Sequence, residues 1–184
     1  IEEIIIEQSK MKSIYFISDI HLDPNNSKVT KKFIEFMNNK SSDMKELYIL
    51  VDLFEFWIDD KYDIIQNNLI ISTLKKISEN GTKIFLMHGN RDFLVGKKFT
   101  KITNIQILPE NYILNLNETK ILITHGDLLC TDDDDYQKFR RFIRNKLILK
   151  IFNLLSNNIK IKIASYLRGK SKKITSVSRV SRWK

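Results

Sequence analysis

The chain has 184 residues, of which 42% are hydrophobic and 29% charged, with five glycines and two prolines. This composition is typical of a folded globular protein and excludes a low-complexity or disordered one. The single cysteine, Cys130, excludes an internal disulfide bond and suits a reducing compartment. Lys and Arg interrupt the apolar runs of the C-terminal part, so the sequence predicts no membrane span. The acidic start lacks the pattern of an export signal.

The net charge of +9 is divided unevenly along the chain. Residues 138–184 hold fifteen Lys or Arg and no Asp or Glu, whereas residues 1–137 hold sixteen basic and twenty-two acidic residues. An acidic body with a basic C-terminal segment indicates an anionic partner for that segment, either a membrane surface or a nucleic acid.

Four short apolar runs each lead directly into polar residues, and each run predicts a strand that is buried on both faces. Polar side chains at the ends of several strands meet at one edge of a parallel sheet, where ligands of α/β proteins bind. The runs are Ile14–Ile17, Leu47–Val51, Lys83–Met87 and Lys120–Thr124, followed by Asp19 and His21, by Asp52, by His88–Asp92 and by His125–Asp127.

Helical patterns alternate with these strands. Apolar spacing predicts helices over 29–39 and 64–80, and Gly81 is suited to the position just past the second helix. Alternation of strand and helix predicts a layered α/β domain.

Five side chains at the strand ends form a candidate two-metal site. Asp19 and His21 can converge on one ion, Asp52 can bridge two ions with its two oxygens, Asn90 offers an amide oxygen and His125 a ring nitrogen. Mixed oxygen and nitrogen ligands suit Mn²⁺ or a similar divalent ion. Two such ions bind phosphate oxygens and activate a bridging water.

Each motif taken alone has a simpler explanation. A single Asp-x-His or His-Gly-Asp occurs at ordinary strand ends, and Gly-Asn-Arg-Asp can form an ordinary turn. The order of all the motifs, each behind an apolar run, favours the metal site. For His88 and Asp92 we favour structural roles, and for Arg91 a contact with phosphate.

The basic C-terminal segment has an amphipathic pattern. Apolar residues recur at helical spacing over 138–155, with arginines and lysines between them. We expect a break at Asn157–Asn158, a second helix over 159–167 and a loop from Gly169 onward. The predicted divisions are an N-terminal extension (1–10), a core (11–137) and a basic helical segment (138–184).

Taken together, the motifs resemble those of the calcineurin-like metallophosphoesterases and, among them, of the hydrolases that cleave UDP-2,3-diacylglucosamine in lipid A biosynthesis. The most specific segments are Phe16–Leu22, Asp52–Ile58, Met87–Leu94 and Thr124–Asp133, the last continuing into Tyr136 and Gln137. The resemblance implies a metallophosphoesterase β-sandwich flanked by helices, with a helical lid insertion.

The resemblance also implies a reaction. It is Mn²⁺-dependent hydrolysis of the pyrophosphate bond of UDP-2,3-diacylglucosamine to UMP and 2,3-diacylglucosamine 1-phosphate. Asp19, His21 and Asp52 would hold the first of two Mn²⁺ ions, with Asp52 bridging, and Asn90 and His125 the second. No catalytic side chain is implied beyond the metal-activated water. The implied substrate contacts are Asn90, Arg91, Asp133, Ser171 and Thr175.

The same resemblance implies a place in the cell. The basic segment would act as a lid over the acyl chains, on the cytoplasmic face of the inner membrane, with no nucleic-acid partner.

Three features depart from the family pattern. The family has a Gly-His-Thr-His motif near its C-terminus, and this chain has only His21, His88 and His125. We therefore expect a truncated or decaying copy, or a fragment, that lacks the C-terminal strands and binds at least one ion weakly. Val51 stands where the family has glycine, and a β-branched residue would be strained in a glycine conformation. Thr175 and Ser178 replace asparagine and lysine contacts.

Two other functions remain open at this point. The chain could be another calcineurin-like phosphoesterase, such as a nuclease or nucleotide phosphatase whose basic segment binds nucleic acid. The apolar helical face argues against this. The other alternative is a non-catalytic remnant that binds membranes.

Overall fold

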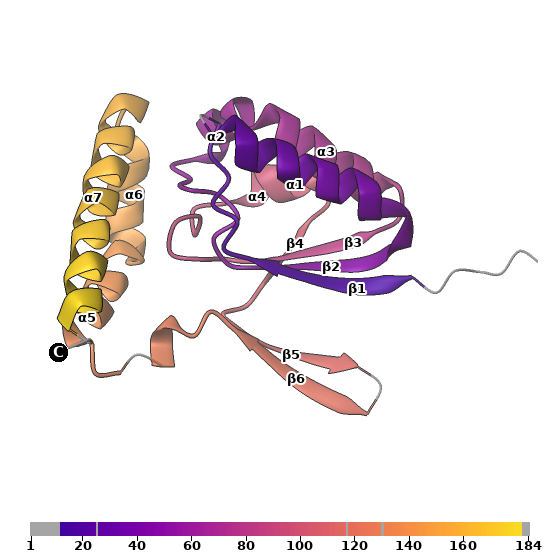
Figure 1. Cartoon of the computed structure of the whole chain (residues 1–184). Coiled ribbons are helices and arrows are strands. Elements are labelled where there is room, and N and C mark those ends of the chain that lie inside the picture. The colour runs from indigo at the N-terminus through magenta and orange to yellow at the C-terminus, as the bar shows by residue number, and fades with distance from the viewer. Residues whose placement is uncertain (1–11, 25, 117, 130, 182–184) are drawn as a thin grey trace, which may run out of the picture.

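The computed structural model describes residues 12–181 apart from 25, 117 and 130, and it gives no side-chain detail for 27 and 170–181. The predicted N-terminal extension, residues 1–10, lies outside the described residues. The described part contains two sheets and two groups of helices (Figure 1).

The larger sheet is parallel and has the order β1-β2-β3-β4. Its strands are β1 (Ser13–Ser18), β2 (Met44–Leu50), β3 (Lys83–Met87) and β4 (Gln106–Leu108). Neighbouring strands are in direct register, with Ile49 of β2 beside Ile17 of β1 and Leu86 of β3. The carboxyl ends of the strands therefore lie side by side, which is the predicted layered α/β arrangement.

Four helices cover one face of this sheet (Figure 1). They are α1 (Ser27–Lys40), α2 (Asp60–Gln66), α3 (Asn68–Glu79) and α4 (Lys97–Thr103). Phe33 and Met37 are one turn apart on α1 and are both buried, as the sequence pattern requires of a helix that packs on a sheet. The main hydrophobic core lies between these helices and the sheet.

The expected helix over 64–80 is two helices. Asn67 separates α2 from α3, and its side chain donates a hydrogen bond to the Asp63 carbonyl, 2.9 Å away. Gly81 lies just past α3 with φ +95°, a left-handed conformation that favours glycine, so its predicted role is confirmed.

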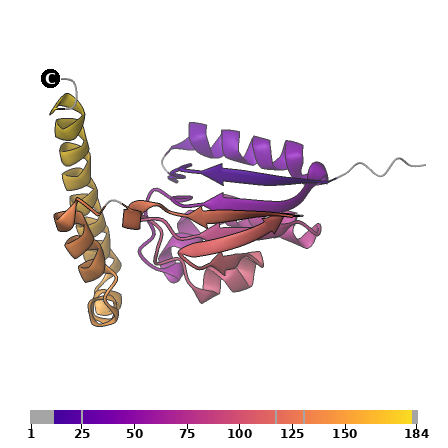
Figure 2. The same cartoon turned by 90° about the horizontal axis from the view of Figure 1, so that it is seen from below.

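A hairpin of β5 (Asn111–Leu116) and β6 (Thr119–Thr124) forms a separate antiparallel sheet. Figure 2, seen from below, shows this hairpin in front of the parallel sheet. A second core of Tyr48, Met87, Leu108, Leu114 and Ile123 joins the two sheets. The prediction that Lys120–Thr124 is buried on both faces was wrong, because the first four residues of β6 are exposed.

Three further helices lie beyond the carboxyl ends of the parallel strands (Figure 1). They are α5 (Asp134–Ile143), α6 (Lys146–Leu154) and α7 (Asn157–Ser181). The expected helix over 138–155 breaks between α5 and α6, where the Asn145 side chain caps α6. A break near Asn157 is confirmed, but the loop expected from Gly169 is wrong, because α7 continues to Ser181.

Candidate metal and phosphate site

The loops that follow β1 and β2 have unusual backbone conformations. Asp19, His21, Val51 and Asp52 all have positive φ angles, between 47° and 61°. Residues other than glycine adopt this region at a cost of about 1–3 kcal/mol each, and such residues cluster at functional sites. The strain predicted for Val51 has its structural basis here, since φ is 61° at a β-branched residue.

Backbone hydrogen bonds hold the two loops together. The Asp19 amide donates to the Val51 carbonyl (3.2 Å), and the His21 amide donates to the Asp52 carbonyl (3.1 Å). Leu22 then forms an isolated parallel bridge with Phe54. These contacts extend the pairing of β1 with β2 past the end of the sheet and fix the side chains that the loops carry.

Asp19, His21 and Asp52 form a group with the chemistry of a metal site. One ligand atom from each residue lies within 4.8 Å of those of the other two. Asp19 is exposed, His21 is half-buried and Asp52 is 8% exposed, so solvent reaches the group through Asp19 and His21. Two carboxylates and an imidazole are donors that suit Mn²⁺ and similar divalent ions.

The loop after β3 closes on Asp52. A Cβ atom added to Gly89 would lie 2.1 Å from Asp52 Oδ1 and 2.4 Å from the Asp52 nitrogen, so only glycine fits at this position. The Arg91 amide donates a hydrogen bond to the same Oδ1, 3.1 Å away. One oxygen of Asp52 is therefore oriented by the backbone of the neighbouring loop.

Asp92 is fully buried and joins the loop after β2 to the loop after β3. Its carboxylate accepts hydrogen bonds from the amides of Leu53 (2.8 Å), Phe54 (3.3 Å) and Gly89 (2.8 Å). Burial raises the pKa of Asp92 to about 6, against the effect of these amides. The orienting role favoured for Asp92 is what the geometry shows.

Two further ligands are predicted for the second ion: Asn90 follows Gly89 in the loop that closes on Asp52, and His125 follows β6. Asn90 lies beside the Tyr136 hydroxyl; burial and Asp127 raise the pKa of Tyr136 to about 12, whereas Asn90 acts to lower that pKa. His125 Nδ1 lies 3.0 Å from Asp127 Oδ1, and His125 does not belong to the group around Asp52. The structure thus brings Asp19, His21 and Asp52 together, while the ligand roles of Asn90 and His125 stay predictions.

Asp127 connects His125 to α5, the first of the three outer helices α5, α6 and α7. Its Oδ2 accepts hydrogen bonds from the Tyr136 hydroxyl (2.9 Å) and from Arg140 Nε (2.6 Å). Although burial favours protonation, the hydrogen bonds from Arg140, Tyr136 and His125 lower the pKa of Asp127 to about 2. Asp127 is an ionised acceptor that can orient the imidazole of His125.

The side chains of His88 and Arg91 have protein partners of their own. His88 Nε2 lies 2.9 Å from the Val95 carbonyl, and burial lowers the pKa of this imidazole. That contact is the structural role favoured for His88. The Arg91 guanidinium pairs with Glu55, a buried carboxylate that the sequence reasoning missed.

The predicted substrate contacts are only partly described. Asp133 is the N-cap of α5, and its carboxylate accepts a hydrogen bond from the Tyr136 amide (3.0 Å). Ser171 and Thr175, like Ser178, are in α7, but their side chains lie outside the described part of the chain. Substrate binding by these residues stays a prediction.

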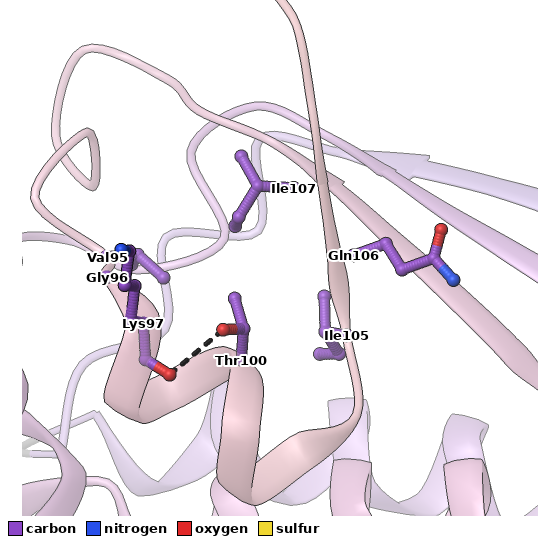
Figure 3. Close-up of a pocket in the computed structure, with 7 residues that line it drawn as sticks. All are labelled: Val95, Gly96, Lys97, Thr100, Ile105, Gln106 and Ile107. Atoms are coloured by element: carbon purple, nitrogen blue, oxygen red, sulfur yellow. Dashed lines mark hydrogen bonds between the residues drawn. The ribbon is translucent and has the colours of Figure 1, made fainter.

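An open hollow of about 400 Å³ lies elsewhere, between α4 and β4 (Figure 3). Its lining includes Val95, Lys97, Thr100 and Gln106, and in the view of Figure 3 the Thr100 hydroxyl bonds to the Lys97 carbonyl. The residues that line it include none of the predicted ligands. The hollow is therefore separate from the candidate site.

A carboxylate–imidazole group at the carboxyl edge of a helix-flanked parallel sheet is the arrangement of a metallophosphoesterase-like protein. No model of a known protein family matches the chain. Curated proteins named UDP-2,3-diacylglucosamine hydrolase do match it.

The protein of Haemophilus influenzae (strain PittGG) is 42% identical over 161 residues, which are 88% of this chain and 68% of the relative. That of Serratia proteamaculans is 43% identical over 156 residues, 85% of this chain and 65% of the relative. That of Yersinia pestis bv. Antiqua (strain Angola) is 41% identical over 159 residues, 86% of this chain and 66% of the relative. The chain belongs to the UDP-2,3-diacylglucosamine hydrolase family.

Proposed function

We propose that this protein hydrolyses the pyrophosphate bond of UDP-2,3-diacylglucosamine, giving UMP and 2,3-diacylglucosamine 1-phosphate. The observation that carries the proposal is the group of Asp19, His21 and Asp52, whose ligand atoms lie within 4.8 Å of one another. The names and the similarity of the relatives supply the substrate. The activity is that of a hydrolase in lipid A biosynthesis.

The donor set offers ligands to two divalent ions but lacks the two histidines of the family's Gly-His-Thr-His motif, so we expect at least one ion to bind weakly. Asp19 and His21 would hold the first, Asp52 would bridge, and Asn90 and His125 would hold the second. When bound, Mn²⁺ ions neutralise phosphate oxygens and lower the pKa of a shared water. The backbone contacts of Asp52 with Arg91 leave its carboxylate fixed in advance, so little reorganisation is needed when ions bind.

The chain itself supplies binding and orientation of the substrate. Arg91 adjoins the metal group through its backbone, and its guanidinium suits bidentate contact with a phosphate. Asn90 and Arg91 would bind the pyrophosphate. Asp133, Ser171 and Thr175, from the outer helices, would bind the sugar and its acyl chains.

The outer helices support a peripheral place at the cytoplasmic face of the inner membrane. Large apolar side chains are exposed on them, including Phe142 (59%), Leu147 (68%) and Leu154 (86%). Exposed Lys146 and Lys150 lie on the same helix as the last two, α6. Helices of this composition bind the surface of anionic bilayers. In the part of the chain that the structure describes, no helix combines the length and apolarity of a membrane span.

The proposal is tested by measuring UMP release from UDP-2,3-diacylglucosamine in mixed micelles, with and without Mn²⁺. We expect release that requires the metal and that the Asp52→Asn variant loses by at least about a hundredfold, since a bridging ligand is removed. Cleavage of an oligonucleotide or a simple nucleotide in preference to this lipid would instead favour another phosphoesterase. Vesicle binding without any hydrolysis would favour a membrane-binding remnant.

A further inference from the structure

We propose that Glu55 is a positioning residue that holds His21 and Arg91 in place and ties both to helix α7. The inference rests on the proposed function for the roles of His21 and Arg91. It goes beyond that function because it assigns a task to a buried carboxylate and to a helix that lies far along the chain.

Glu55 faces a predicted metal ligand. The residue is 6% exposed, and its Oε2 lies 3.8 Å from His21 Nδ1. That ring nitrogen is buried and has no hydrogen-bond partner among the described residues. An imidazole whose Nδ1 is directed at a carboxylate presents Nε2 to a metal, and such a partner fixes both the tautomer and the ring orientation.

The other oxygen of Glu55 faces two guanidinium groups. Arg91 pairs with Oε1, and Arg168 Nε of α7 lies 2.6 Å from the same oxygen. One carboxylate between two arginines leaves a surplus positive charge beside the metal group. That surplus is complementary to a phosphate, so the pair can keep Arg91 oriented while the arginines still attract an anion.

A second ion pair joins α7 to the same loop. Lys160 is 4% exposed, and its Nζ lies 2.7 Å from Asp59 Oδ2. The loop between β2 and α2 therefore carries Asp52 and both anchors of α7, Glu55 and Asp59. Docking of α7 and the orientation of the side chains at the metal group therefore depend on one short segment. Within it, Glu55 is the residue that faces both His21 of the metal group and Arg168 of α7.

The test measures Mn²⁺ affinity by titration calorimetry and the protection of the α7 amides (157–169) by hydrogen exchange, on the intact chain. Glu55→Gln keeps the shape and removes the charge. We expect Mn²⁺ affinity about tenfold weaker or worse, as for other carboxylate partners of metal-binding histidines, together with faster exchange in α7. Lys160→Met should speed exchange in α7 but leave the Mn²⁺ affinity within about twofold of the wild type.

The controls separate positioning from a general loss of charge or stability. Glu79→Gln removes an exposed carboxylate that pairs with Lys75 on α3, and it should change neither readout. If Glu55→Gln does not fold, Glu55→Asp keeps the charge but withdraws it by one methylene, and it should show the same two changes in weaker form. Arg168→Gln should speed exchange in α7.

Unchanged Mn²⁺ affinity in Glu55→Gln, or in Glu55→Asp where that variant replaces it, would overturn the proposal. Unchanged exchange of α7 in Arg168→Gln would overturn its second half. Both readouts are independent of the substrate. Failure of the wild-type chain to release UMP would therefore count against the proposed reaction, and not against Glu55.

Discussion

At the scale of single residues, the backbone at the ends of β1 and β2 governs the site. Four residues there have positive φ, and Val51 is the one whose side chain is least suited to it. The sequence alone could predict this conflict, because the family resemblance indicates a glycine at that position. It could not predict Glu55, since its partner Arg168 lies in a distant helix and no strand or helix pattern marks the loop.

Val51 gives the first prediction. Replacing a buried valine with glycine loses about 2–3 kcal/mol of side-chain burial and about 0.5–1 kcal/mol of backbone entropy. At Val51 the relief of about 1–3 kcal/mol of strain offsets most of this loss. Val51→Gly should therefore lower the free energy of unfolding by only about 1 kcal/mol in urea titrations. Val95, which is 3% exposed and has no positive φ, is the control, and Val95→Gly should cost about 3 kcal/mol. Equal losses in the two variants would show that Val51 is unstrained.

Gly89 gives the second prediction. A methyl group there would meet Asp52 Oδ1 and the Asp52 backbone, which cannot both move without displacing the metal group. Gly89→Ala should weaken Mn²⁺ binding by about tenfold or more and cost about 1–3 kcal/mol of stability. Gly169→Ala is the matched control, because among the described residues outside the glycine's own helix turn nothing lies within 4 Å of the added Cβ, and it should leave both values unchanged or slightly raise stability. Tight Mn²⁺ binding by Gly89→Ala would contradict this account of Asp52.

At the scale of elements, apolar patterns predicted most of the sheet and the first helices. The run Lys83–Met87 is the whole of β3, and the ends of β1 and β2 lie within three residues of the predicted ones. The run Lys120–Thr124 looks the same in sequence, but it belongs to a hairpin. A short apolar run carries no information about the direction of its partner strand, so this difference follows only from tertiary contacts. Similarly, α7 extends through a Lys- and Ser-rich stretch in which local composition gave no apolar face.

The start of α2 gives a prediction about pH. Asp63 is 1% exposed, and its Oδ2 accepts hydrogen bonds from the amides of Ile58 (2.6 Å) and Asp59 (3.0 Å). Burial, aided by the carboxylates of Asp59 and Asp60, raises the pKa of Asp63 from 3.8 to about 6. The folded state therefore binds a proton more tightly than the unfolded state. The stability that protonated Asp63 contributes is present below about pH 4 and is lost as the pH rises through about 6.

The measurement compares the wild type with Asp63→Asn, which cannot titrate. Between about pH 4 and pH 7 the free energy of unfolding of the wild type should fall by about 2 kcal/mol relative to that of the variant. Parallel pH profiles for the two chains would contradict the raised pKa of Asp63.

At the scale of the whole molecule, an acidic core carries a basic helical layer, as the charge division predicts. Several of the basic side chains are not free to bind a partner, because Arg140 and Arg144 both pair with Glu110, and Arg144 also bonds to the Gly89 carbonyl. Part of the basic charge is therefore used in contacts that hold α5 against the core. The exposed apolar residues of α5 and α6 remain as the candidate membrane contact.

Phe142 tests that contact. It is 59% exposed on α5, and we expect Phe142→Asp to weaken binding to anionic phospholipid vesicles by about tenfold or more, because an apolar anchor becomes a repelled charge. Ile65→Asp is the control, since Ile65 is 69% exposed on α2, in the layer that covers the sheet. A loss of the same size in both variants, in a flotation assay, would show a non-specific charge effect.

The central claim is that Asp19, His21 and Asp52 form the metal site of a UDP-2,3-diacylglucosamine hydrolase. Its most direct test is UMP release from that lipid by the intact chain with Mn²⁺, compared with release by Asp52→Asn and by wild type in the presence of a chelator. We expect release by the wild type with Mn²⁺ and only background release in the other two samples. Equal release in all three, or none above background in any, would contradict it.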